Sequence, residues 1–234
     1  MKIRLTPPIR LETRLNNKIK SLLKDVEDRF KRMDADIAFR DVVTIGEIDS
    51  SFKGVINDID RDELKVWLND FYKDVFDYVL TKIKKPHLEL SKNEIELISF
   101  YVIQTLELVE VAMSDFSKDV GYILSNGLIE GKTIQELTKE LIKATNMSRN
   151  RAETIAISQT SNANSRFARE SFKRLKINNA TWSSAKDKRV RKCHLARSGV
   201  SYNVDEGCYS PCDGRYLHTG QEVRCRCAMI IELF

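Results

Sequence analysis

The sequence predicts an α+β protein, in which a mainly α-helical N-terminal region is followed by a small α+β C-terminal module with a cysteine/histidine cluster. Apolar residues recur at helical spacing through the first two thirds of the chain, whereas short strand-like runs occur in the last third. All five cysteines lie at or after Cys193. The 234 residues, 42% of them hydrophobic, are enough to bury a core and do not have the composition of a disordered chain.

Residues 1–10 are predicted to form an extended arm. Thr6-Pro7-Pro8 disfavours helix because each proline ring fixes its own φ and restricts the residue before it. Such an arm is either a disordered leader or a segment that grips a neighbouring subunit. The charged start has no apolar run behind it and is not typical of a secretory signal.

Residues 11–147 are predicted to form a helical domain. Two amphipathic stripes open it, and Ser91-Lys-Asn-Glu94 is typical of a capping box that starts a third helix, closed near Leu124 by Asn126-Gly127. A second capping box, Thr133 to Glu136, predicts another helix. The stripes are Leu15, Ile19, Leu22, Leu23, Val26, Phe30, then Leu64, Trp67, Leu68, Phe71, Val75, Val79, Ile83. The most apolar stretch, 95–113, is interrupted by Glu96, Gln104, Glu107 and Glu110, so no membrane span is expected.

Residues 148–234 are predicted to form a separate module. Ser148 is expected to cap a helix whose apolar residues, Phe167 and Phe172 among them, belong to the core, and Asn178-Asn179 is expected to break it. Strands are expected over 180–183 and 229–233. The module holds 16 Lys and Arg against 8 Asp and Glu, a charge of +8, whereas residues 1–147 hold 23 against 26, a charge of −3.

The module concentrates residues that bind zinc in proteins. Zinc takes four tetrahedral ligands, and two cysteines at i and i+2 on a strand place both sulfurs on one face. The candidate ligands are, in order of preference, Cys225 and Cys227, then Cys208 and Cys212, with His194 as the main substitute and His218 as a weaker one. Disulfides, a nucleophilic Cys193 and unligated thiols remain alternatives, although five cysteines cannot all pair.

Three motifs of the last third resemble the phage Mu F-like head-morphogenesis family, in that family's order. They are Arg151-Ala-Glu-Thr-Ile-Ala156, then Trp182 followed by Asp187-Lys-Arg-Val-Arg191 and His194, and finally Cys225-Arg-Cys227. Where the family has Arg-Thr-Glu after Ile-Ala, this chain has Ile157-Ser158-Gln159. Cys208 and Cys212 go beyond the common pattern.

The resemblance implies a minor head protein in the virion, present in few copies near the portal vertex and made in the host cytoplasm. It implies a non-enzymatic role in assembly and in DNA packaging and ejection, with the portal and other head proteins as partners. No catalytic residue, membrane or small-molecule substrate is expected, and the helical region would dock on the portal or capsid. Basic residues expected to meet packaged DNA through its phosphates are Arg189, Arg191, Lys192, Arg224 and Arg226.

Two other functions fit parts of the sequence. A zinc-stabilised nuclease or toxin would draw a hydrolytic site from Asp187, Glu206, Asp213 and two histidines, but no nucleophile, base and oxyanion donor assemble from recognisable motifs. A zinc-ribbon DNA-binding regulator would need a recognition helix with base-reading side chains, which the sequence does not resemble.

Overall fold

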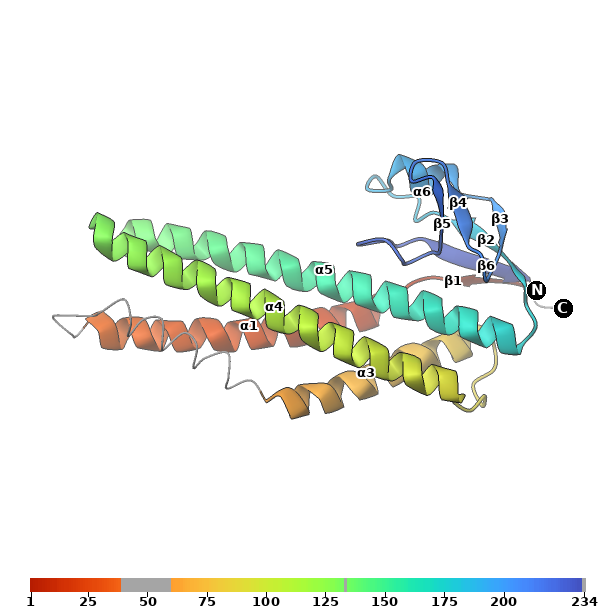
Figure 1. Ribbon diagram of the computed structural model, residues 1–234, viewed down its shortest axis with the longest axis horizontal. Helices are drawn as coiled ribbons and strands as arrows, with labels where there is room; N and C mark the ends of the chain where they lie inside the picture. The colour runs from red at the N-terminus through yellow and green to blue at the C-terminus, as the bar shows by residue number, and fades with distance from the viewer. Residues whose placement is uncertain (39–59, 133, 233–234) are drawn as a thin grey trace. The chain divides into compact units, whose positions relative to one another are not determined.

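The computed structural model describes residues 1–38, 60–132 and 134–232 and confirms the predicted α+β class, with long helices followed by small sheets (Figure 1). The long helices are α1 (Ile9–Ala38), α3 (Arg61–Lys82), α4 (Lys92–Glu130) and α5 (Ile134–Arg174). The short elements are β1 (Lys2–Leu5), β2 (Asn179–Ser183), α6 (Lys192–Ala196), β3 (Ser201–Asn203), β4 (Cys208–Ser210), β5 (Arg215–Leu217) and β6 (Ala228–Glu232).

The described chain divides into two compact units. The first comprises Met1–Leu15, Lys65–Gln104 and Ala156–Phe234, and the second comprises Asn16–Leu64 and Thr105–Ile155. Helix α5 continues across the expected domain boundary between residues 147 and 148. That boundary, and the independence of the segments on either side of it, stay predictions.

The main sheet of the first unit joins both ends of the chain. Its antiparallel order is β1-β6-β2-β3, and Leu5 pairs with Met229 in the β1–β6 register. The expected extended arm is therefore extended over Lys2–Leu5, but it pairs within its own chain, and helix α1 already begins at Ile9. Leu5 is 1% exposed, because alternate residues of β1 face the core.

The two predicted stripes form the buried faces of their helices. Leu15, Ile19 and Leu23 of α1 are buried, and Leu22 is half-buried. The second stripe, which runs through α3 and one residue past it, is buried except for Trp67, which is half-buried. The side chains of Val26 and Phe30 lie outside the described part of the chain. Phe167 and Phe172 of α5 are fully buried, which confirms their assignment to the core. Both predicted strands are confirmed as β2 and β6.

Some helix boundaries follow from the local sequence, whereas others depend on contacts with distant residues. The capping box is confirmed, since the Ser91 amide donates to Glu94 Oε2 at 2.7 Å and the Glu94 amide donates to Ser91 Oγ at 3.4 Å. The expected stop at Asn126-Gly127 is wrong, because α4 continues to Glu130. Gly127 instead lets Leu137 approach: a Cβ on Gly127 would lie 2.2 Å from Leu137 Cδ2.

The expected helix start at Ser148 is also wrong. Ser148 lies inside α5 and is 3% exposed, because nothing in the preceding turn breaks the helix. Thr133, the expected cap of the other box, lies outside the described residues, although α5 begins directly after it at Ile134. Serine and threonine occur at helix starts and within helices, so the sequence signal was ambiguous.

Within the second unit, ion pairs join its helical segments. Arg149 pairs with Glu27 at 3.4 Å, and Arg151 pairs with Asp115 at 3.0 Å.

Among the described helices, Lys92–Gly127 of α4 is long and apolar enough to cross a membrane, with a mean hydropathy of 1.4. That value belongs to an 18-residue window, half of which is buried inside the protein, and length and composition alone are weak evidence for a span.

Candidate metal centre

Three buried side chains converge in the first unit: His194 from α6, and Cys225 and Cys227 from the segment before β6. Their ligand atoms all lie within 4.8 Å of one another. His194 Nδ1 is 3.2 Å from Cys227 Sγ and 3.7 Å from Cys225 Sγ. The bond lengths of a tetrahedral zinc site place a bound nitrogen and a bound sulfur about 3.5 Å apart. The donor set and its spacing therefore fit one metal ion with three protein ligands.

The opposite edge of the His194 ring faces a carboxylate. His194 Nε2 lies 2.9 Å from Glu222 Oε2, and Arg197 Nη2 lies 2.8 Å from the same oxygen. Arg197 is 1% exposed, and its guanidinium carbon lies 4.2 Å from the centroid of the Trp182 ring. A metal-bound histidine commonly points its second nitrogen at a carboxylate, which fixes the ring orientation.

The charges of this cluster depend on one another. The hydrogen bond from Cys227 lowers the pKa of Cys225, against the effect of burial and with help from His194. The same bond, together with burial, raises the pKa of Cys227. Burial opposes the ionisation of Glu222, but Arg197 and His194 outweigh it and lower the Glu222 pKa. The cluster therefore favours one thiolate and one thiol, and a metal bound to both sulfurs would displace the remaining proton.

Helix α5 holds the loop that carries the cysteines. Ser158, Ser161 and Ser165 are spaced three and four residues apart, so they lie on one face of the helix. Ser161 Oγ donates to the Cys225 carbonyl at 2.5 Å, and the Arg224 amide donates to Ser158 Oγ at 3.0 Å. Ser158, where the sequence departs from the family pattern, thus binds the cysteine loop.

Gly220 lets the same loop approach α5 closely. Its φ is +77°, and a Cβ at this position would lie 2.4 Å from the Ser161 carbonyl oxygen. The Gly220 amide donates to Cys225 Sγ at 3.3 Å. Only glycine combines this backbone conformation with this close approach, and its amide stabilises a thiolate.

The structure corrects part of the predicted ligand set. Cys212 forms a disulfide with Cys193, with their Cα atoms 5.9 Å apart, so in this structure neither has a thiolate to offer a metal. Cys208 is a buried free thiol whose pKa is raised by burial, and it lies outside the convergent group. His218 also lies outside that group, and burial lowers its pKa to about 4.

The predicted DNA-contacting cations differ in their surroundings. Arg226 pairs with Asp187, and Arg191 pairs with Glu222 and donates to the Val223 carbonyl. The Arg224 side chain is half-buried. The remaining two, Arg189 and Lys192, are exposed, and no described carboxylate pairs with them.

The residues of the alternative hydrolytic site are dispersed. Asp187 pairs with Arg226, Asp213 accepts from Ser210 Oγ, and Glu206 is exposed. Among the described residues, the convergent group of potential ligands is His194, Cys225 and Cys227.

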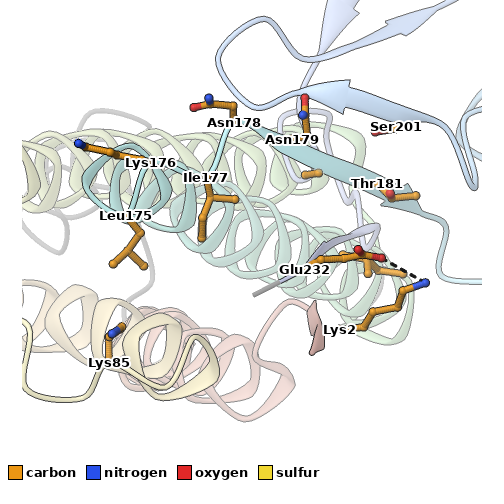
Figure 2. Close-up of a pocket in the computed structure, with 12 residues that line it drawn as sticks. Lys2, Lys85, Leu175, Lys176, Ile177, Asn178, Asn179, Thr181, Ser201 and Glu232 are labelled. Carbon is orange, nitrogen blue, oxygen red and sulfur yellow. Dashed lines mark ion pairs between the residues drawn. The ribbon is translucent and has the colours of Figure 1, made fainter. Parts of the chain in front are cut away.

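A separate surface pocket of about 850 Å³ lies beside the end of α5 and the sheet (Figure 2). Lys2, Lys176 and Glu232 are among the residues that line it, and Lys2 forms an ion pair with Glu232. None of the residues that line it is a cysteine or a histidine.

Sequence reasoning missed Glu222, Arg197, Gly220 and the serine face of α5. The serines recur at helical spacing, but a polar helix face is normally exposed to solvent, so this pattern did not indicate that they bind a loop. Glu222 and Arg197 carried no local signal. They are 25 positions apart and meet only through the fold.

Comparisons with known proteins agree with the resemblance in the last half of the chain. The family model described as "Phage Mu protein F like protein" matches residues 118–230, a range that contains the whole cluster. An uncharacterized protein of Haemophilus influenzae is 24% identical over 144 residues, which are 62% of this chain and 31% of that protein. The chain thus spans less than a third of the length of this relative. No solved structure matches the chain.

Proposed function

We propose, from the similarity of residues 118–230 to phage Mu protein F like proteins, that the chain is a minor protein of a phage head. It acts without catalysis at the portal vertex, in head assembly and in the packaging and ejection of DNA. The family match carries this proposal. The protein enters the virion head from the host cytoplasm, where heads assemble.

Exposed apolar residues of the helices support docking on a large partner. Phe100 and Ile103 of α4 are 45% and 53% exposed. Residues three positions apart lie on one helix face, and an exposed apolar face of this kind fits the groove of a partner protein. The portal and other head proteins are the proposed partners.

The His194-Cys225-Cys227 cluster is proposed to hold structural zinc. The three side chains are 4%, 2% and 4% exposed, so the site is closed to a substrate. Three protein ligands leave the fourth tetrahedral position of the ion to a solvent molecule, and burial keeps substrate away from that position, which suits a metal that stabilises a fold. The metal would join α6 to the segment before β6, at the edge of a module with small strands.

The proposal is tested in the phage or prophage that encodes the chain. Heads produced after an in-frame deletion are compared with heads complemented by the wild-type gene, by electron microscopy and DNA content, and purified heads are analysed by mass spectrometry. We expect few copies per wild-type head, fewer filled heads after deletion, and capture of the portal by the tagged chain. Either normal filled heads after deletion or absence of the chain from wild-type heads would refute the proposal.

A further inference from the structure

An exposed aromatic pair lies on the small hairpin of β4 and β5, residues 208–217, here called the tyrosine hairpin. Tyr209 and Tyr216 face each other across the two strands, with ring centroids 5.5 Å apart. They are 51% and 60% exposed, whereas Cys208 and Leu217, the neighbouring cross-strand pair, are 1% exposed. Since side chains alternate along a strand, both rings lie on the solvent face of the hairpin.

The disulfide ties this hairpin to a cationic segment. Cys212 lies in the hairpin turn and Cys193 lies in α6, and Figure 1 shows α6 beside β4 and β5. Tyr209 is three residues from Cys212, so at most about 10 Å of chain separates it from the disulfide. Lys192 directly precedes Cys193.

The segment before the disulfide, residues 186–192, is here called the basic loop. It holds five exposed cations. Arg191 pairs with Glu222, whereas no carboxylate of the described residues pairs with Lys186, Lys188, Arg189 or Lys192. The single acid of the loop, Asp187, is already paired with Arg226. Four cations are thus available for negatively charged groups of a partner.

Cations beside exposed aromatic rings match the chemistry of single-stranded nucleic acid. Lysine and arginine bind phosphates, while tyrosine rings stack on bases that a duplex would keep stacked on one another. We propose that the tyrosine hairpin and the basic loop form one binding site for single-stranded nucleic acid. This inference rests on the proposed role with packaged DNA and narrows it to exposed single strands, such as unpaired ends.

The test measures fluorescence anisotropy of a labelled 12-nucleotide strand and of the same sequence as a duplex, with the full chain under non-reducing conditions. We expect tighter binding of the single strand. Y209L/Y216L should weaken single-strand binding at least tenfold, because leucine keeps apolar bulk but cannot stack, whereas Y209F/Y216F should bind as the wild type does. Tyr122→Leu removes another exposed tyrosine and serves as the control.

The basic loop is tested through salt dependence. K186Q/K188Q/R189Q should reduce the slope of log affinity against log salt by about 0.7 for each phosphate that the loop no longer neutralises, and Lys139→Gln/Lys143→Gln on α5 should change it less. Circular dichroism checks the fold of each variant. A duplex bound as tightly as the strand, unchanged binding by the leucine variant, or binding of phosphatidylserine vesicles in place of the strand would overturn the inference.

Different results would refute the single-strand binding site and the proposed role in the phage head. Heads that contain Y209L/Y216L protein at normal copy number, together with no single-strand binding by wild-type protein, overturn only the inference. Absence of the wild-type chain from heads refutes the function whatever the oligonucleotides show.

Discussion

His194 Nε2 and Glu222 Oε2 lie 2.9 Å apart, on the side of the imidazole ring away from the two cysteine sulfurs. The carboxylate thus lies at the ring nitrogen that a metal on Nδ1 would leave free, and Arg197 Nη2 donates to the same carboxylate oxygen. We expect Glu222→Ala to weaken zinc binding 10–100-fold, because a carboxylate behind a metal-bound histidine both orients it and raises its basicity.

Competition with a chelating zinc indicator measures this effect. Glu206→Ala, which removes an exposed carboxylate of the same module, is the control and should bind zinc as the wild type does. Equal affinities for wild type and Glu222→Ala would show that Glu222 does not support a metal ligand.

Gly220 should tolerate no side chain. Gly220→Ala adds a Cβ 2.4 Å from the Ser161 carbonyl oxygen, whereas Gly199→Ala meets nothing within 4 Å although its φ is also positive, at +90°. Both variants carry left-handed strain of about 1–2 kcal/mol. We expect Gly220→Ala to cost about 1–3 kcal/mol more than Gly199→Ala, through overpacking, in urea unfolding. Equal losses would mean that the loop moves off α5 freely.

Glu12 should make stability depend on pH. It is 7% exposed, and burial raises its pKa from 4.5 to about 7, opposed by Arg226. Between these pH values the folded chain keeps a proton that the unfolded chain releases, so stability falls as pH rises through this window. The cost above pH 7 is on the order of 3 kcal/mol.

The matching variant is Glu12→Gln, which keeps the shape and removes the charge. Its free energy of unfolding should exceed that of the wild type at pH 8 and approach it at pH 5, in chemical denaturation at both values. Parallel pH profiles for the two proteins would contradict the assignment.

The β1 strand should stabilise the first unit from within the same chain. Leu5→Ala removes a side chain that is 1% exposed and should cost about 2–5 kcal/mol. Lys2→Ala, on the same strand, breaks an exposed ion pair with Glu232 and should cost at most about 1 kcal/mol. Thermal unfolding compares them, and similar losses would mean that β1 is not packed on the core in solution.

The sequence predicted those features whose cause is local. Apolar spacing placed α1 and α3, and the capping box at Ser91 placed the start of α4. The fold class followed, because stripes at helical spacing and short alternating runs occupy different parts of the chain. His194, Cys225 and Cys227, three of the candidate ligands named from the sequence, converge in the structure, and their binding of a metal stays a prediction.

Features that depend on distant partners were missed or wrong. Cys212 was grouped with the ligands because its spacing from Cys208 suits a turn, but its disulfide partner Cys193 is 19 residues away. The arm pairs with β6, which lies at the other end of the chain. Gly127 resembled a helix stop because the packing of Leu137 against it is not visible in a local pattern.

The metal content of the purified chain tests the central claim about the site most directly. Elemental analysis under reducing conditions, with the disulfide open, should find about one zinc per chain. Cys225→Ser and Cys227→Ser should lose it, and Cys208→Ser, which alters a buried thiol outside the group, should keep it. Absence of metal from the wild type, or equal zinc in all four proteins, would contradict a zinc site at His194, Cys225 and Cys227.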